Sequence, residues 1–317
     1  MSEPQDRPSY RLFHTTVDAI DTSRPSMVRV QVVGDCLQHF GRAGLDQRIK
    51  VLFPPYDEGA GEHLPMPDLG PEDFPDDSGM INLYRDSRAM DTPPTWRTYT
   101  VRRIDPDGEW LQIDFVLHGT TSPSARWLNS LSVGDPVTII GPDERSKRSR
   151  GGIEWKPGGA STILIAGDET ALPAVAAIAE SGTIPDGADV CIVIEAPDTA
   201  DLDDFEADPS WTVHRLARSA GENPGEAMER QVRDFLAGKP EFLGDRQAAT
   251  QAVETADADE TLWDTADDVD AGGHYAWLAG EAGAVTRLRR HLVKELGVDK
   301  RAVSFMGYWK LGKAAAG

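Results

Sequence analysis

The feature that most constrains the fold is a change in hydrophobic patterning near the middle of the chain. Before residue 145, short segments rich in β-branched and aromatic residues follow one another, separated by Pro, Gly and Asp turn signals. After residue 160, apolar segments of strand length alternate with segments of helical spacing. Many short strands predict a small barrel, whereas strands alternating with helices predict a parallel sheet with right-handed crossovers. We therefore expect an N-terminal antiparallel β-barrel followed by a parallel-sheet α/β domain, for which 317 residues suffice.

The expected domain boundaries follow from the same change. Residues 9–144 are predicted to form the barrel domain, residues 145–160 a basic linker, and residues 161–317 the α/β domain. The linker is placed at the run from Arg145 to Arg150, a basic stretch in an acidic protein. An acidic loop is expected at about residues 245–273, because the stretch from Gln247 to Thr286 contains no Lys or Arg.

Propensity and turn signals also predict the individual elements. The barrel strands are expected at Arg11–Val17, Met27–Val33, Arg48–Phe53, Trp96–Arg103, Trp110–Leu117 and Val137–Ile140, with a long surface loop at Tyr56–Asp77. In the second domain we expect strands at Ser161–Ala166, Asp189–Glu195, Trp211–Leu216, Tyr275–Ala279 and Ala302–Phe305, and helices at Ala171–Glu180, Gly225–Leu236 and Ala284–Leu296.

Composition and charge exclude several classes of function. The formal net charge of −21 argues against nucleic acid or an anionic membrane surface as a partner. No apolar run approaches the roughly 20 residues that span a bilayer, and the first eight residues are too polar for a signal peptide. Cys36 and Cys191, the two cysteines, lie far apart and indicate neither a structural disulfide nor a metal site. A soluble cytoplasmic protein is expected.

The segment Trp96–Arg103 carries the first chemical signal. Strand side chains alternate between faces, so Arg97 and Tyr99 lie on the same side. An arginine can bind a phosphate bidentately while a neighbouring tyrosine ring covers a flat heterocycle, and Thr100 can reach such a heterocycle through its amide or hydroxyl. By itself, the segment is better explained as an ordinary strand with one surface arginine.

A second signal is the acidic turn Gly167–Thr170, between an expected strand and an expected helix. Ligands bind at the carboxyl ends of parallel strands, so a nicotinamide ring could lie there, and Gly280-Glu281 follows another strand in the same way. Glu195, also at a strand end, could meet a ribose hydroxyl. The usual Gly-x-Gly-x-x-Gly fingerprint is absent, however, and taken alone an acidic pair at a helix N-terminus is better explained as a structural cap.

Together, four stretches resemble the siderophore-interacting proteins, a family of the ferredoxin-reductase superfamily. They are Arg97-x-Tyr99-Thr100, Asp114–Gly119, Gly167–Ala174 and Gly307–Gly312. The resemblance runs from about Tyr10 to Lys313, and the Gly-Asp-Glu-Thr-Ala-Leu-Pro run is its most specific part. It implies that the barrel binds FAD, that the α/β domain binds a nicotinamide cofactor, and that the protein reduces ferric siderophores.

The resemblance also implies roles for particular residues. Those expected to contact FAD are Arg97, Tyr99, Thr100, Val116, His118, Gly119, Ser124, Ala125 and Trp127. Those expected to contact the nicotinamide cofactor are Gly167, Asp168, Glu169, Thr170, Gly280, Glu281 and Trp309. Candidates for attracting an anionic siderophore are Arg145, Lys147, Arg148, Lys310 and Lys313, although the basic run can equally be a solvated linker.

Two stretches depart from the family pattern. The family has Gly-Pro-Ala-Ser-x-Trp after the His-Gly pair, whereas here the segment Ser122–Trp127 has Ser in place of that Gly and of the Ala. This puts the backbone geometry at Ser122 in question. Lys310 stands where the family usually has Arg, which keeps the charge but loses the bidentate fork.

The expected function is NAD(P)H-dependent, FAD-mediated reduction of a ferric siderophore, which releases Fe(II) in the cytoplasm. The seven histidines lack metal-ligand spacing, and no catalytic side chain is expected because the flavin supplies the chemistry. The choice between NADH and NADPH stays open, and ferredoxin is an alternative donor. A general flavin or ferredoxin-type reductase and a non-catalytic siderophore carrier are the competing interpretations.

Overall fold

The computed structural model describes residues 6–117, 122–203, 205–239, 242, 263–264 and 273–312. The chain divides into two compact units, Met1–Ile153 together with Gly317, and Glu154–Ala316. The division therefore falls within residues 145–160, and the basic run lies in the first unit.

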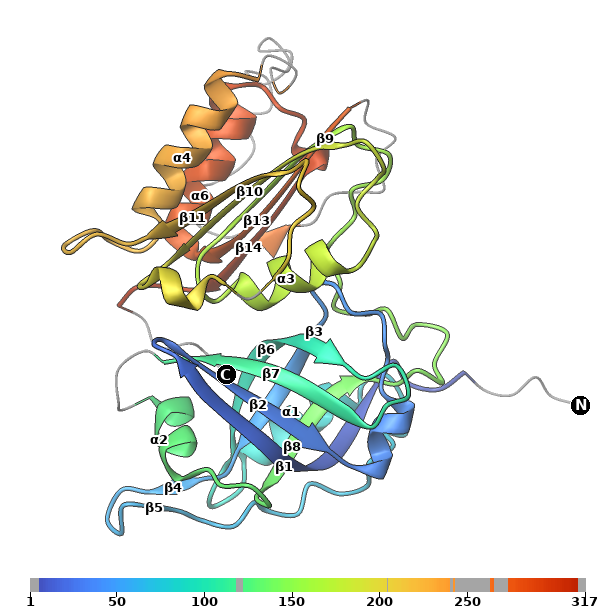
Figure 1. Cartoon of the computed structure of the whole chain (residues 1–317). Helices are drawn as coiled ribbons and strands as arrows, with labels where there is room; N and C mark the ends of the chain where they lie inside the picture. The colour runs from blue at the N-terminus through green and yellow to red at the C-terminus, as the bar shows by residue number, and fades with distance from the viewer. Residues whose placement is uncertain are drawn as a thin grey trace, which may run out of the picture. The chain divides into compact units, whose positions relative to one another are not determined.

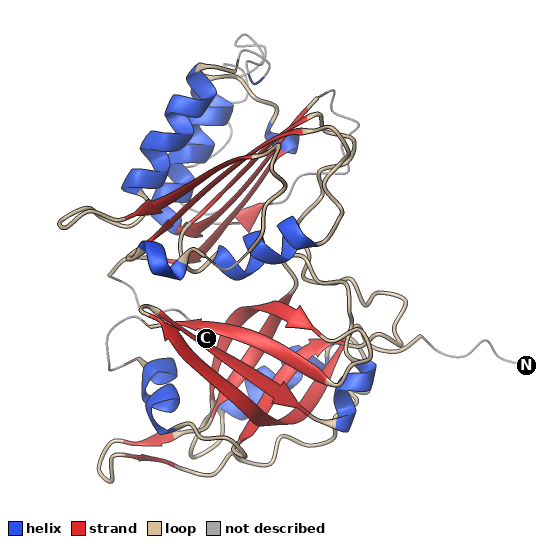
Figure 2. Ribbon diagram, in the orientation of Figure 1, coloured by secondary structure: helices blue, strands red, loops and turns tan. Residues whose placement is uncertain are grey.

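The first unit is a closed antiparallel barrel with the strand order β1-β2-β7-β6-β3-β8 (Figures 1 and 2). Its strands are β1 Tyr10–Arg24, β2 Met27–Val33, β3 Arg48–Phe53, β6 Thr95–Ile104, β7 Trp110–Val116 and β8 Pro136–Pro142. Alternating side chains of these strands point inward and form a continuous core that includes Phe13, Val30 and Ile139. The predicted antiparallel barrel is confirmed.

The segment between β3 and β6 is not the plain surface loop that its Pro, Gly and acidic residues predicted. The predicted loop range, Tyr56–Asp77, contains a short hairpin, β4 Tyr56–Asp57 with β5 Glu62–His63. A helix at residues for which no element was predicted, α1 Gly79–Arg88, follows it. Leu69 and Phe74 from this segment pack against Leu12, Leu52 and Trp96 in a second apolar cluster. The segment thus covers apolar side chains of the barrel wall, which explains why it carries apolar residues among its polar ones.

The second unit is a sheet with the strand order β11-β10-β9-β13-β14-β12. The strands are β9 Thr162–Gly167, β10 Asp189–Ala196, β11 Thr212–Ala217, β12 Trp263–Asp264, β13 His274–Glu281 and β14 Val303–Trp309. Every pairing is parallel except the one between β12 and β14. The predicted parallel sheet is confirmed, and its direction of winding reverses between β9 and β13.

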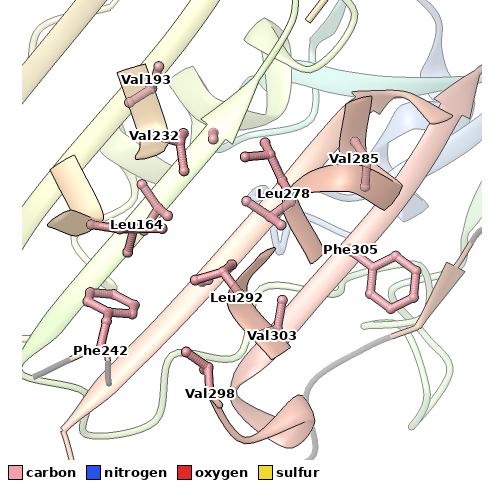
Figure 3. Close-up of a cluster of buried hydrophobic side chains, with 14 of the residues drawn as sticks. Leu164, Val193, Val232, Phe242, Leu278, Val285, Leu292, Val298, Val303 and Phe305 are labelled. Atoms are coloured by element: carbon pink, nitrogen blue, oxygen red, sulfur yellow. The ribbon is translucent and has the colours of Figure 1, made fainter. Parts of the chain in front are cut away.

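Helices cover both faces of this sheet. α4 Glu226–Ala237 and α6 Ala282–Arg290 lie on one face, and α3 Leu172–Glu180 lies on the other (Figure 1). The core beneath α4 and α6 joins Leu164, Val232 and Val285, among other residues (Figure 3). The predicted basic helix starts at Ala282, but its α-helical part ends at Arg290 and continues as a π-helical turn, His291–Glu295.

Short 3-10 turns complete the described elements. They are η1 Asp35–His39, η2 Thr199–Asp201 and η6 Lys300–Ala302, while α2 Pro123–Ser130 follows β7 in the barrel unit. In the part of the chain that the structure describes, no helix combines the length and apolarity that crossing a bilayer requires. The predicted acidic loop at residues 245–273 lies almost entirely outside the described residues.

Candidate functional site

β6 presents the first candidate site on the barrel. Arg97 pairs with Val51 of β3, and Tyr99 pairs with Ile49, so the two side chains lie on the same face of the strand. The Arg97 Nη1 atom donates to the carbonyl oxygen of Trp96 at 2.8 Å. Among the described residues, no carboxylate pairs with this guanidinium.

Tyr99 is held by other aromatic rings. Its ring lies 4.6 Å from that of Phe115 and 6.1 Å from that of Phe53, centroid to centroid. Trp127 packs behind these two rings, at 5.4 Å and 5.1 Å, and is only 4% exposed. Burial raises the pKa of Tyr99 to about 12, despite a hydrogen bond with Ser124, so its hydroxyl stays protonated.

A positive cluster surrounds this strand, and the sequence analysis did not identify it. Lys50 of β3 donates to the Thr98 hydroxyl at 2.7 Å. Burial, together with the charges of Arg48 and Arg97, lowers the pKa of Lys50. Lys50 is thus close enough to both arginines for their charges to act on it, although Lys50 pairs with Thr98 and so lies on the strand face opposite Arg97. The alternation Arg48-x-Lys50 was a visible signal, but only the pairing of β3 with β6 brings it to Arg97.

The N-terminus of α2 is the next part of this region. Ser122 is its N-cap, and its hydroxyl accepts from the amide of Ala125 at 3.1 Å and lies 3.2 Å from the Ser124 hydroxyl. The backbone at Ser122 has φ −66° and ψ 153°, an extended conformation open to any residue. The Ser in place of the family's Gly is therefore compatible with the turn.

The remaining residues expected to contact FAD from the barrel are either partly or fully buried or lie outside the described residues. Thr100 is 5% exposed and pairs with Arg48 across the β3–β6 ladder. Val116 is the last residue of β7 and is half-buried. His118 and Gly119 lie outside the described residues.

In the α/β unit, Asp168 joins the carboxyl ends of three neighbouring strands. Its Oδ1 accepts from the amide of Thr170 at 2.9 Å and from the Thr170 hydroxyl at 2.5 Å. Its Oδ2 accepts from the Glu281 amide at 2.7 Å and from the Trp309 indole at 2.8 Å. Asp168 is fully buried, and burial with the nearby Glu169 carboxylate raises its pKa to about 6. Its oxygens are therefore occupied by the protein itself.

The Gly280-Glu281 turn is shaped by the same carboxylate. Gly280 has φ 137°, and a Cβ at this position would lie 2.6 Å from the Asp168 carboxylate. Glu281 caps α6 by accepting from the Ala284 amide at 2.8 Å, and it also accepts from the Leu311 amide at 3.2 Å. Gly167 is also tightly packed, because a Cβ there would lie 2.6 Å from that of Ala171.

Glu169 belongs to a buried ion triad that sequence reasoning missed. Arg218, the residue after β11, donates to Glu169 and to Glu195 at 2.6 Å each. Glu195 also accepts from the amides of Gly225 and Met228 at 2.9 Å, which caps α4. Neither glutamate is exposed to solvent. Glu195 is thus a cap and an ion-pair partner.

The basic run is anchored to the barrel unit by acidic residues. Arg145 pairs with Asp143 at 2.7 Å and with Asp73 at 2.8 Å, and Arg148 pairs with Asp77 at 2.6 Å. These contacts explain why the run is ordered as part of the barrel.

The other basic candidates have a different environment. Lys147 and Lys310 are exposed, whereas Lys313 lies outside the described residues. Among the described residues, no group of three His, Cys, Asp or Glu side chains could hold a metal ion.

The fold of the two units identifies the structural class of this protein. A closed antiparallel barrel followed by a parallel sheet wound in two directions is also the fold of the ferredoxin reductase in carbazole 1,9a-dioxygenase. That structure has a TM-score of 0.52 and 16% identity, and the match covers 98% of this chain and 71% of the other. The chain is therefore a two-domain protein with a ferredoxin-reductase-like fold.

The family follows from the sequence models. Residues 160–312 match the siderophore-interacting protein model, and residues 16–146 match the siderophore-interacting FAD-binding domain. The two matches cover most of the chain. The protein belongs to the siderophore-interacting protein family, and its barrel is an FAD-binding domain.

Individual relatives agree with this placement. Rv2895c, an uncharacterised protein of Mycobacterium tuberculosis, is 29% identical over 302 residues, covering 91% of this chain and 87% of the relative. The ferric vibriobactin reductase ViuB of Vibrio cholerae is 26% identical over 288 residues, covering 91% and 85%. The crystal structure of a siderophore utilization protein from T. fusca has a TM-score of 0.65 and 24% identity, covering 98% and 96%.

Proposed function

We propose that this protein is a ferric-siderophore reductase that uses FAD and takes electrons from NAD(P)H. Membership of the siderophore-interacting family supports the substrate class, and the relative ViuB is named a ferric vibriobactin reductase. The observation that carries the proposal is the Arg97 guanidinium, which has no carboxylate partner among the described residues and lies on the same strand face as Tyr99. A negatively charged protein keeps such a group uncompensated when an anionic ligand completes the site.

The barrel residues fit the two chemically distinct parts of FAD. Arg97 would hold the pyrophosphate, supported by the positive potential of Arg48 and Lys50. Tyr99 offers a flat ring whose hydroxyl stays protonated, so it would contact the flavin ring without adding negative charge. Thr100 of β6 and Val116 of β7 would line the same FAD site, and Trp127 would support the aromatic rings that hold Tyr99.

The turn after β7 would complete the FAD site. His118, Gly119, Ser124 and Ala125 are the proposed contacts in this segment. Ser124 and Ala125 lie in the first turn of α2, where backbone amides and the helix dipole favour a phosphate. When bound, FAD would accept electrons as a pair and release them singly to Fe(III).

In the α/β unit, the segments Gly167–Thr170 and Gly280-Glu281 would act mainly by fixing the backbone turns at which NAD(P)H binds. Asp168 and Glu281 hold the turns after β9 and β13 in place, and Asp168 fixes the indole of Trp309. Glu169 is tied to Arg218 in the same way. We propose that NAD(P)H contacts the backbone of these turns rather than their buried carboxylates, which would repel its phosphates.

We further propose that exposed lysines attract the siderophore. Fe(III) siderophores carry hard, anionic oxygen ligands, and these ligands hold Fe(II) far less strongly than Fe(III). Lys147, Lys310 and Lys313 would therefore contribute to binding. Arg145 and Arg148 are already paired with aspartates, so their contribution to siderophore binding would be smaller than that of the lysines. Reduction would loosen the iron without any protein ligand to the metal.

The test is anaerobic oxidation of NAD(P)H by the FAD-loaded protein with a ferric siderophore, while a chromogenic chelator traps Fe(II). The proposal expects Fe(II) to form well above the rate without protein. Reduction of free flavin but not of ferric siderophore would instead identify a general flavin reductase. A colourless protein that binds ferric siderophore without reducing it would identify a carrier, and either result would reject the proposed reaction.

A further inference from the structure

The charge around the end of β10 bears on which nicotinamide cofactor the protein uses, an inference that rests on the proposed function. In sheets wound like this one, the second strand from the switch point ends next to the adenosine ribose. An acidic residue there accepts from the 2′-hydroxyl of NADH, or a nearby arginine binds the 2′-phosphate of NADPH. Here the strand is β10, its acid is Glu195, and the nearby arginine is Arg218.

Neither residue is free to perform these roles. One oxygen of Glu195 accepts from Arg218 and from the Gly225 amide, and the other accepts from the Met228 amide. The Arg218 side chain is only 13% exposed, and its remaining nitrogens are directed at Glu169. With both side chains engaged by the protein, the electrostatic potential of the surrounding loops is the described feature that distinguishes the two nucleotides at the 2′ position.

The other cations near these strand ends are also engaged. Arg215 donates to the carbonyl oxygens of Leu202 and Phe205 at 3.1 Å, with Asp203 at 3.9 Å. Arg230 pairs with Glu222 at 2.5 Å. Within residues 197–203 and 205–230, every arginine that the structure describes thus has an acidic neighbour.

The exposed groups in this region are mainly acidic. Asp198 and Asp203 follow β10 and are exposed. The Asp203 side chain is 85% exposed, and its long contact with Arg215, at 3.9 Å, is a weak surface pair that offsets little of its charge. Lys310 follows β14, which is the third strand from β10 in the sheet. At the usual strand spacing, β14 lies about 14 Å from β10, so Lys310 is far from these aspartates. A 2′-phosphate adds about −1.5 to −2 charges next to this acidic surface.

We propose that the acidic surface formed by Asp198 and Asp203 makes this protein select NADH over NADPH. The selection is a repulsion between these aspartates and the 2′-phosphate of NADPH, which NADH lacks. The described arginines in this region are engaged by acidic side chains and do not offset this repulsion. Because the two aspartates are exposed, dissolved salt screens their effect. The preference therefore has a signature that a shape-based preference lacks, namely its dependence on ionic strength.

The experiment measures anaerobic reduction of the bound flavin by NADH and by NADPH in a stopped-flow spectrometer. At low ionic strength we expect the second-order rate constant for NADH to exceed that for NADPH by about tenfold or more. At about 0.5 M salt the ratio should fall severalfold, because the Debye length then shrinks to roughly 4 Å.

Two variants test the assignment to these aspartates. Asp203→Lys should raise the NADPH rate constant severalfold at low salt. Asp198→Asn should raise it less, because it removes one negative charge without adding a positive one, and Asn can still cap the Ala200 amide. Asp234→Lys makes the same charge change at an exposed position late in α4 and should leave the NADH/NADPH ratio unchanged.

Three results would overturn the inference. The first is an NADPH rate constant equal to or above that of NADH, and the second is an NADH/NADPH ratio that does not change with ionic strength. The third is an Asp203→Lys variant whose ratio equals that of Asp234→Lys. If neither nucleotide reduces the flavin, the inference fails together with the proposed donor. Photoreduced protein that still reduces ferric siderophore would show that only the donor assignment is lost, and not the reductase function.

Discussion

At the scale of single residues, the strand pattern was sufficient to find Arg97 and Tyr99 but not their surroundings. Alternation along one strand places two side chains on the same face whatever the tertiary fold is. Lys50 and Arg218 could not be found in this way, because their neighbours come from other strands. Asp168 was identified as a residue of interest, yet two of its four donors, the Glu281 amide and the Trp309 indole, come from the ends of β13 and β14.

The first residue-scale prediction concerns FAD binding. Arg97→Ala should weaken FAD affinity about tenfold to a hundredfold, because a charge-assisted contact to the pyrophosphate is lost. Arg103→Ala is the matched control, since Arg103 is an exposed arginine on the same strand. Fluorescence titration of the apoprotein with FAD measures both affinities. Equal affinities for the two variants would contradict the role of Arg97.

A second prediction concerns Asp114, which is buried between Arg29 and Arg24. Burial would raise its pKa, but hydrogen bonds and charge from Arg29 and Arg24 hold it below the usual 3.8. Its stabilisation is therefore present above about pH 4 and is lost as the pH falls through the lower folded-state pKa. Asp114→Asn should lower the free energy of unfolding by about 3 kcal/mol at neutral pH.

The same variant should also change the acid response. Relative to the wild type, Asp114→Asn should lose less stability between pH 4 and the acid limit, because the titrating carboxylate is gone. Asp107→Asn, at an exposed turn position, is the control and should follow the wild type. Urea unfolding at a series of pH values measures this, and parallel curves for wild type and Asp114→Asn would refute the assignment.

At the scale of elements, the predicted strands and helices agree with the structure where the pattern is periodic, as in β2, β10 and α4. The helix α1 was missed because it lies among Pro, Gly and acidic residues that normally indicate a loop. Its apolar side chains Met80, Leu83 and Tyr84 pack against the barrel wall, a contact that the local sequence does not reveal. Tertiary packing thus decided the structure of this segment.

The turn between β13 and α6 gives the prediction at this scale. Gly280→Ala should cost about 3 kcal/mol, because it combines a backbone conformation reserved for glycine with a Cβ directed at the Asp168 carboxylate. Gly187→Ala separates the two causes: Gly187 has φ 74° and open space around its Cβ position, so its cost should be about 1 kcal/mol. Denaturant unfolding compares them, and equal costs would argue against the Asp168 contact.

At the scale of the whole molecule, the change in patterning predicted the order and class of both units. The barrel core and the core beneath α4 and α6 share no residue. Each unit therefore has the means to fold by itself. The sequence could not show that the basic run belongs to the barrel unit, since its aspartate partners Asp73 and Asp77 are far away in the chain.

Separate folding is testable. A fragment of residues 1–153 should unfold cooperatively and retain FAD, because the described FAD candidates all lie within it. Far-UV circular dichroism and FAD titration measure the two properties. A fragment that is unstructured, or folded but unable to bind FAD, would contradict the assignment of the cofactor to the barrel.

The central claim, that a flavin on the barrel passes electrons from a nicotinamide nucleotide to a ferric siderophore, is tested most directly by one anaerobic titration of the FAD-loaded protein. NADH should bleach the visible flavin band, and about two equivalents of ferric siderophore per flavin should restore it, with Fe(II) appearing in the same proportion. A bleached band that ferric siderophore does not restore, or restoration without Fe(II), would contradict the account.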